Sequence, residues 1–301
     1  MDHASHTTSN RFSVGQCVAL ATLLEATAPK AGNVHRGADF EDVTFPEFVA
    51  AGIAIAPVLD QAAGRPLGAT ILAAVEATRR VAASNTNLGT ILLLAPLAAV
   101  PRDRTLAHGV AAVLAGLSPG DARDCYAAIR LATPGGMGHV DEGDLDREPP
   151  TDLLWAMRLA ADRDLVARQY ISGFHEVFEC VVPWLTADLA AGLKLLDAII
   201  HVHIRLMSAF PDSLIARKCG AAVAARSAQR AAQVLAAGEP GSDAYYDALG
   251  DLDFWLRSDG HRRNPGTTAD LLAAGLFVLL REGIMKEPLL GSSFSYPAIP
   301  L

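Results

Sequence analysis

The chain has 301 residues, of which 51% are hydrophobic and 19% charged, and its formal net charge is −8 at pH 7. An acidic chain without a basic block is a poor match for an extended polyanion, so nucleic acid is not an expected partner. So much apolar surface needs a large core, and we expect a single domain over residues 1–301.

The apolar runs are all interrupted before they reach the ~20 residues that a membrane-spanning helix needs. Pro96 interrupts the run from Ile91 to Val100, and Arg281 ends the run that starts at Leu271. The first residues carry neither a basic leader nor an apolar stretch before a cleavage site. We therefore expect a cytoplasmic protein with no membrane partner.

Helix-period apolar patterns recur along nearly the whole chain, whereas alternating β-branched stretches are almost absent. The predicted fold class is all-α, a bundle of roughly ten to twelve helices. Residues 1–11 and 288–301 are expected to be extended tails. The expected helices cover residues 12–28, 44–62, 67–83, 89–99, 103–115, 119–131, 151–171, 174–182, 187–209, 211–237, 243–259 and 267–284.

Polar segments that contain Gly or Pro interrupt this apolar chain, and we expect the chemistry to lie in them. In a bundle, residues that belong neither to the core nor to a solvated helix face collect at helix ends, where free backbone N–H groups can also hold phosphate. The segments are residues 29–42, 84–89, 133–150 and 258–268.

The first of these junctions combines carboxylate, ammonium, amide and imidazole groups. An ordinary solvated loop is the alternative, because Pro29 and Gly32 would end the preceding helix in any case. The variety of polar types favours a site instead. The catalytic candidates are Glu25 and Asp39, the substrate-binding candidates are Lys30, Asn33 and His35, and the candidate Mg²⁺ ligands are Asp39 and Asp42.

The second and third junctions place polar side chains and glycines beside helix ends. Residues 84–89 begin a very apolar helix, where they would either cap it or hold a phosphate or a sugar hydroxyl. Residues 133–138 form a glycine-rich loop whose backbone can approach a ligand closely, followed by acids that either bind Mg²⁺ or form a solvated run. The substrate-binding candidates are Asn85, Thr86, Asn87, Gly89, Gly135 and Gly136.

The predicted helix 151–171 carries both a structural and a functional candidate. Asp164 and Arg168 are four residues apart, which predicts an ion pair within the helix. Tyr170 lies in the same apolar segment, which offers few places for a hydroxyl group. We therefore include Tyr170 among the substrate-binding candidates.

The predicted helix 211–237 begins with a carboxylate and two cations. Asp212 is favourable near a helix N-terminus without any function, because of the helix dipole, and it is also a catalytic candidate. Arg217 and Lys218 follow on an Ala-rich helix. They are the best candidates for binding a triphosphate, since Arg binds phosphate oxygens in a fork.

The last predicted helix follows a Pro-Gly turn. Thr267 and Asp270 have the spacing of a capping box, which explains both residues without a site. Asp270 remains a catalytic candidate and Asn264 a substrate-binding candidate.

Taken in order, these segments resemble the triphosphoribosyl-dephospho-CoA synthase family over residues 25–282. Each piece is weak by itself, and the specificity comes from the ordered set. The shared pieces are Glu25, Pro29-Lys30-x-Gly32, Gly37-Ala38-Asp39, Asn85-Thr86-x-x-Gly89, Pro134-Gly-Gly-Met-Gly138, Asp164, Gln169-Tyr170, Pro211-Asp212-Ser-Leu-Ile-Ala-Arg217-Lys218-x-Gly220 and Asn264-Pro-Gly-Thr-Thr-Ala-Asp270-Leu.

The resemblance implies an all-α enzyme that transfers a 5-triphosphoribosyl group from ATP to a hydroxyl of 3′-dephospho-CoA and releases adenine. The product would be a prosthetic-group precursor. ATP and dephospho-CoA are then the small-molecule substrates, with Mg²⁺ expected beside the triphosphate.

The chain departs from the family pattern at several positions. The loss of a His and a Lys from the second junction leaves the identity of the acceptor more open than that of the donor. The family's Pro-Lys-Pro-Gly, Asn-Thr-His-Lys-Gly and Gly-Ala-His-x-Asp-Met are here Pro29-Lys30-Ala31-Gly32, Asn85-Thr86-Asn87-Leu88-Gly89 and Gly37-Ala38-Asp39-Phe40-Glu41-Asp42.

Breaking the N-glycosidic bond of ATP builds positive charge on the ribose C1′. Such a transition state needs a carboxylate near the sugar, an acid for the departing adenine and a base for the attacking hydroxyl. Either Glu25 or Asp39 is the expected base, and Asp212 is expected to stabilise the sugar cation. Lys30, Arg217 and Lys218, with Mg²⁺, are expected to hold the triphosphate.

Three alternatives remain open at this point. The first is a relative that uses the same ATP donor on another cofactor precursor, for example in tetrahydromethanopterin biosynthesis. The others are an all-α Mg²⁺-dependent hydrolase of nucleotides or ADP-ribose, and a non-catalytic helical scaffold. The oligomeric state is also open, with a homo-oligomer as one alternative. The deciding observation is whether Glu25, Asn85, Asp212 and Arg217 face a single pocket.

Overall fold

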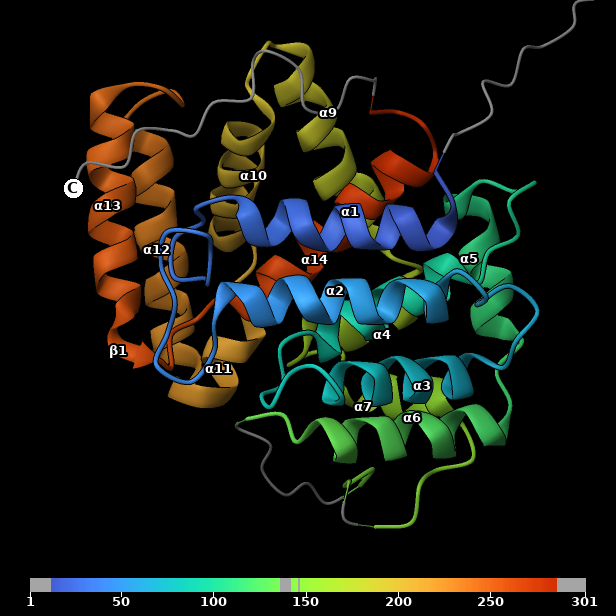
Figure 1. Ribbon diagram of the computed structural model, residues 1–301. Helices are drawn as coiled ribbons and strands as arrows, with labels where there is room; N and C mark the ends of the chain where they lie inside the picture. The colour runs from blue at the N-terminus through green and yellow to red at the C-terminus, as the bar shows by residue number, and fades with distance from the viewer. Residues whose placement is uncertain (1–11, 136–141, 146, 286–301) are drawn as a thin grey trace, which may run out of the picture.

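The computed structural model describes residues 12–135, 142–145 and 147–285, and within them the predicted all-α fold is confirmed (Figure 1). The predicted tails lie outside these residues. The elements are α1 (Val14–Thr27), α2 (Phe45–Leu59), α3 (Leu67–Arg79), α4 (Leu88–Ala98), α5 (Leu106–Ala115), α6 (Pro119–Ala132), α7 (Leu153–Ala160), α8 (Leu165–Ser172), the π-helix η1 (Val177–Val181), α9 (Val182–Ala190), α10 (Leu195–Ala209), α11 (Ser213–Cys219), α12 (Ala221–Ala237), α13 (Asp243–Arg257), the short β1 (Ser258–His261) and α14 (Gly266–Arg281).

The described residues contain more helices than predicted because three predicted helices are interrupted. The Asp164 side chain accepts hydrogen bonds from the N–H groups of Val166 and Ala167, so a new helix starts there. Gly192 and Gly220 have φ angles of 91° and 92°, a region that favours glycine and ends a right-handed helix. The interrupted predictions are residues 151–171, 187–209 and 211–237.

Side-chain caps define where several helices begin. Ser13 Oγ accepts a hydrogen bond from the N–H of Gln16, and the Gln16 side chain accepts one from the N–H of Ser13 at 2.8 Å, which makes a capping box for α1. Ser118 and Asp121 form the same arrangement at the start of α6. These caps satisfy N–H groups that have no partner within the helix.

Helix α14 is the central element of the bundle. It contacts α1, α4, α10, α9 and η1, and Figure 1 shows it behind α1 in the middle of the molecule. Every residue from Leu271 to Arg281 is buried. A helix that is apolar on all sides is stable only inside a large core. The hydrophobic cluster around α14 includes residues from Val14 to Leu280.

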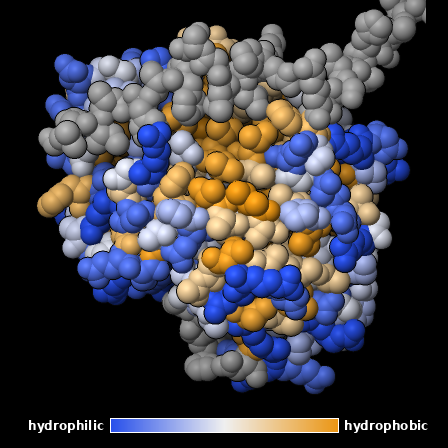
Figure 2. Space-filling view, viewed as in Figure 1, coloured by the Kyte–Doolittle hydropathy of each residue, from blue (hydrophilic) through white to orange (hydrophobic). Residues whose placement is uncertain are grey.

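The face formed by α1 and α2 is unusually apolar. Figure 2 shows hydrophobic residues gathered across the middle of this face, and Ile53 of α2 is 56% exposed. In the part of the chain that the structure describes, no helix is both long and apolar enough to cross a membrane.

Candidate functional site

A cavity of about 780 Å³ opens between α1, α4, α6, α7, α8, α11 and the start of α14. This volume is in the usual range for small-molecule sites. The polar junctions that are far apart in the sequence meet here. The predicted site residues that line the cavity are Glu25, Asn33, Asp42, Asn85, Thr86, Asn87, Gly89, Gly135, Arg217, Lys218, Asn264 and Asp270.

Glu25 enters the cavity from the C-terminal turn of α1 and is paired with a buried lysine. Lys30 Nζ lies 2.9 Å from Glu25 Oε1 and also donates to the backbone carbonyls of Glu25 and Ala28. Lys30 is fully buried, and it is absent from the cavity wall. Contrary to the prediction, Lys30 therefore does not lie where a triphosphate could bind in the cavity. It holds Glu25 instead, since a buried carboxylate needs a partner.

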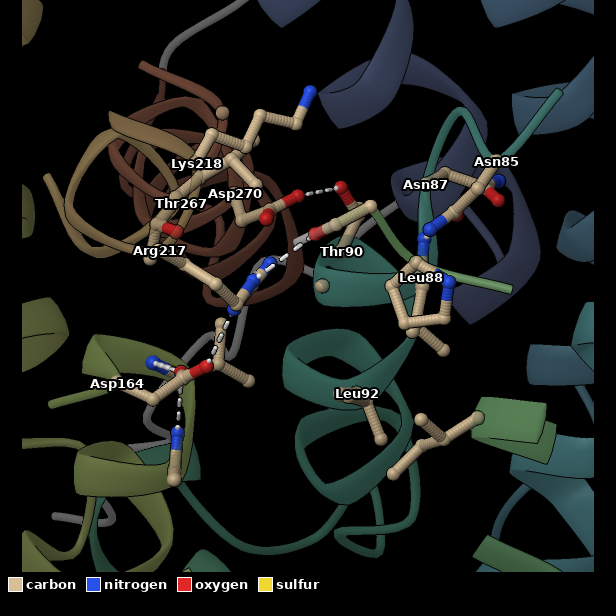
Figure 3. A pocket seen from close by; sticks show the side chains of 18 of the residues that line it. Asn85, Asn87, Leu88, Thr90, Leu92, Asp164, Arg217, Lys218, Thr267 and Asp270 are labelled. Atoms are coloured by element: carbon tan, nitrogen blue, oxygen red, sulfur yellow. Dashed lines mark hydrogen bonds and ion pairs between the residues drawn. The ribbon is translucent and has the colours of Figure 1, made fainter. Parts of the chain in front are cut away.

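Asp270 faces the cavity from α14, opposite the first turn of α4 (Figure 3). Thr90 Oγ1 donates a hydrogen bond of 2.6 Å to Asp270 Oδ1. The residue keeps some accessible surface toward the cavity, but loss of solvent around the carboxyl raises its pKa to about 8, and the nearby Glu25, Asp212 and Asp164 charges act in the same direction. Asp270 therefore carries a proton at neutral pH.

The predicted capping box at the start of α14 is wrong. The helix begins at Gly266, its cap residue Pro265 has no side-chain hydrogen bond, and Asp270 bonds to Thr90 of α4 instead. The carboxyl is thus turned away from its own helix end. This leaves Asp270 available to a ligand in the cavity.

The segment before α4 presents polar atoms without hydrogen-bond partners. Ser84 Oγ, Thr86 Oγ1, Asn87 Nδ2 and Asn33 Oδ1 are all buried and unsatisfied, and all four residues line the cavity. Leaving a buried polar atom without a partner costs about 1–3 kcal/mol. These four residues give this part of the cavity wall a polar character that suits a polar ligand.

Arg217 connects three parts of the cavity wall (Figure 3). Its Nη1 lies 3.1 Å from Asp164 Oδ2, and its Nε donates to the carbonyl of Gly135 at 3.2 Å. The predicted pair of Asp164 with Arg168 is wrong, because Arg168 Nη1 faces Glu176 Oε1 at 3.7 Å. Asp164 instead caps α8 and fixes the guanidinium of Arg217.

Two further cations supply positive charge to the same side of the cavity. Lys218 lines it from α11, and burial together with the Arg217 charge lowers the pKa of its ammonium group. Arg163 lines it from the turn before α8. Among the described residues, the side chains of Arg163 and Lys218 form no ion pair. This side of the cavity therefore suits an anion.

Asp39 and Asp42 do not form the predicted metal site. Asp39 is exposed, accepts a hydrogen bond from the N–H of Phe45 and is absent from the cavity wall. Asp42 lines the cavity but pairs with His261, with Oδ1 2.6 Å from Nδ1. The described residues contain no group of three or more His, Cys, Asp or Glu side chains that could hold a metal ion.

Asp212 has a structural position that differs from its predicted catalytic one. The carboxylate is buried and accepts hydrogen bonds from the N–H groups of Leu214 and Ile215, and from both the N–H and the hydroxyl of Thr268. It does not line the cavity. With these bonds made, Asp212 joins α11 to α14.

His35 and Tyr170 also lie away from the cavity wall. His35 is buried and accepts a hydrogen bond from the N–H of Gly37, and burial lowers its pKa to about 4, so the ring is neutral. The Tyr170 hydroxyl donates to the carbonyl of Leu92 at 2.7 Å inside the core. The structure therefore does not bring these two predicted site residues to the cavity wall. Gly136, the remaining substrate-binding candidate, lies outside the described residues.

Several residues of the cavity were not predicted. Thr90 follows Gly89 directly, and its hydroxyl position depends on the register of α4 against α14. Arg163 directly precedes the cap of α8, and His261 lies in the polar segment 258–268, which are the signals that the sequence offered for them. A large apolar part of the wall comes from α6 and α7, with Ile129, Leu153, Met157 and Ala160.

Comparisons with known proteins identify the family of the chain and a related fold. Residues 11–288 match the family model described as ATP:dephospho-CoA triphosphoribosyl transferase. A solved structure from Archaeoglobus fulgidus, assigned provisionally as a triphosphoribosyl-dephospho-CoA synthase, is 24% identical, with a TM-score of 0.60. The match covers 78% of this chain and 99% of that one, and it supports the fold. No curated protein matches the chain.

Proposed function

Because the chain belongs to the ATP:dephospho-CoA triphosphoribosyl transferase family, we propose that its cavity binds ATP and transfers the 5-triphosphoribosyl group to a hydroxyl of 3′-dephospho-CoA. Adenine is the leaving group. The observation that carries the proposal is the convergence of carboxylates, unsatisfied polar atoms and cations on one cavity. Of the four residues whose convergence the sequence predicts, Glu25, Asn85 and Arg217 line this cavity and Asp212 does not.

The two carboxyl groups of the cavity suit opposite tasks in this reaction. Asp270 is protonated at neutral pH, and in our proposal it gives its proton to a ring nitrogen of adenine as the bond from C1′ to adenine breaks. Glu25 takes the proton of the acceptor hydroxyl as the new bond from C1′ to oxygen forms. One proton enters adenine and one leaves the acceptor, so the exchange balances, and solvent restores both groups.

The positions of the charges favour one orientation of ATP. Arg163, Arg217 and Lys218 are the cations that face the cavity from α11 and the α7–α8 turn, and they would hold the triphosphate. The unsatisfied amide and hydroxyl groups before α4 would bind the ribose hydroxyls. The apolar wall of α6 and α7 offers a surface for the adenine ring.

Magnesium enters this proposal with the nucleotide. The described residues contain no group of three or more His, Cys, Asp or Glu side chains that could hold the ion by themselves. Mg²⁺ commonly takes its ligands from substrate phosphates, water and one or two carboxylates. No step assigned to Glu25 or Asp270 depends on the metal.

The proposal is tested by product analysis. The purified protein, incubated with ATP, Mg²⁺ and 3′-dephospho-CoA, should release adenine and form a triphosphoribosylated dephospho-CoA that chromatography and mass spectrometry detect. Adenine release with free ribose triphosphate, unaffected by dephospho-CoA, would identify a hydrolase. Adenine release that requires another cofactor precursor would retain the donor and change the acceptor. No adenine release under any of these conditions would contradict the proposal.

A further inference from the structure

Three arginines surround one tryptophan outside the cavity. The guanidinium carbons of Arg226, Arg230 and Arg263 lie 5.6, 5.0 and 4.6 Å from the ring centroid of Trp255. We call these four residues the arginine patch. Cation–π contact holds each guanidinium against the ring. Arg263 also donates to the Trp255 carbonyl and to Ser258 Oγ, at 2.9 and 3.2 Å, so the N–H donors of Arg226 and Arg230 are the ones that can bind an acceptor.

The patch carries more positive charge than its neighbours balance. Asp259 faces both Arg262 and Arg263, with N–O distances of 3.8 and 3.7 Å. Within the described residues, Arg226 and Arg230 have no ion pair and no side-chain hydrogen bond. In a chain with a net charge of −8, cations gathered on one indole repel one another, and a bound anion would remove this repulsion.

The patch adjoins the mouth of the cavity. His261 and Asn264 line the cavity on either side of Arg262 and Arg263 in the sequence. Arg262 Nη2 donates to the carbonyl of Lys218 at 3.3 Å, and Ala221, the first residue of α12, also lines the cavity. Figure 1 shows β1 beside α11, at the end of the paired helices α12 and α13. A ligand that extends out of the cavity past α11 would reach the patch.

We infer that the arginine patch binds the diphosphate group of the acceptor, while the cations inside the cavity hold the triphosphate of the donor. This inference rests on the proposed function. A transfer between two phosphate-bearing substrates places two groups of negative charge near one reaction centre. Two separate sets of cations keep these groups apart, and the patch supplies the second set.

The test uses the double variant R226Q/R230Q, which removes two charges and keeps hydrogen-bonding side chains of similar length. The control is R65Q/R80Q, which removes the same charge from exposed positions near α3. Calorimetry should show a Kd for 3′-dephospho-CoA about 10-fold or more higher in R226Q/R230Q, and a weaker dependence of that Kd on salt. The Kd for ATP should stay unchanged, as should both constants in the control.

A second variant, R226K/R230K, keeps the charge and removes the guanidinium fork. Its affinity for 3′-dephospho-CoA should fall between those of the wild type and R226Q/R230Q, and matching thermal unfolding curves will show that all variants are folded. An unchanged acceptor Kd in R226Q/R230Q would overturn the inference and leave the proposed function standing. Weaker binding of ATP instead, or a change of oligomeric state, would also overturn it. A wild-type protein that does not bind 3′-dephospho-CoA would overturn both.

Discussion

A Cβ atom on Gly89 would lie 2.0 Å from Oδ2 of Asp270. The first turn of α4 therefore has no room for a side chain opposite this carboxyl. Thr90, the next residue, holds the same carboxyl through its hydroxyl. Together the two residues fix the position of Asp270 in the cavity, one by leaving space and the other by a hydrogen bond.

Replacing Gly89 with alanine should displace Asp270 and lower the rate of adenine release about 100-fold, since a shift of about 1 Å in a reacting group has effects of this size. Overpacking should also lower the free energy of unfolding by about 1–3 kcal/mol. Gly250 is the matched control: it lies in α13 with no atom within 4 Å of an added Cβ, so G250A should keep full activity. Normal activity in G89A would show that the reaction does not depend on this carboxyl.

Replacing Asp270 with asparagine should lower kcat by about 10²–10⁴-fold, because the side chain can no longer give a proton to the leaving adenine. The affinity for ATP should change little. D251N, at an exposed position of α13, is the control with the same chemical change. If D270N released adenine at the wild-type rate, the proton donor would have to be another group.

The pKa of Asp270 predicts how the rate and the stability depend on pH. In the wild type, kcat should fall as pH rises through about 8, where the carboxyl loses its proton. Between pH 3.8, the ordinary pKa of an aspartate, and about pH 8, the folded state holds a proton that the unfolded state has lost, so this group stabilises the protein less as pH rises. The unfolding free energy of D270N relative to the wild type should therefore increase from pH 5 to pH 8, as measured in urea.

Removing one partner of the Glu25–Lys30 pair should be more damaging than removing both. K30M leaves a buried carboxylate unpaired, which should lower the free energy of unfolding by about 3–5 kcal/mol. The double variant E25Q/K30M should recover part of this loss in a double-mutant cycle measured by urea unfolding. Strict additivity of the two single effects would mean that the pair has no energetic coupling. E25Q alone should lose adenine transfer and still bind ATP.

Replacing Arg217 with glutamine should raise the Kd for ATP about 10-fold or more, because it removes a fork-shaped phosphate ligand and releases Asp164 and the Gly135 carbonyl. R168Q is the matched control from α8, where the guanidinium faces Glu176 and is absent from the cavity wall. Calorimetry with ATP separates the two variants. An ATP affinity in R217Q equal to that of R168Q would remove Arg217 from the phosphate site.

The fold class was predictable because the apolar periodicity is strong and local. Helix α14 is an example, since its uninterrupted apolar residues are those of a buried helix. The helix breaks at Asp164 and Gly220 were not predictable from the periodicity. A cap or a left-handed turn inside an Ala-rich segment depends on what packs around it. The sequence thus predicted where helices occur better than where they end.

The segments that form the site were predictable from the sequence. The role of each residue within those segments was not. Asp212 and Asp270 both lie near a helix N-terminus, and the sequence does not distinguish them. Thr268 turns toward Asp212, and Thr90 bonds to Asp270. Both contacts are set by the packing of α14 against α4 and α11, which no local pattern encodes. Of these two catalytic candidates, Asp212 caps α11, and Asp270, for which a capping role was the alternative, faces the cavity.

The position of α14 has a consequence for how the protein is made. The helix that fills the centre of the bundle and carries Asp270 is synthesised after all the other helices described above. A nascent chain that has not yet released α14 from the ribosome lacks both the middle of its core and one wall of its cavity. Nucleotide cannot stabilise such a fragment, and truncation before residue 266 should yield chains that aggregate or are degraded.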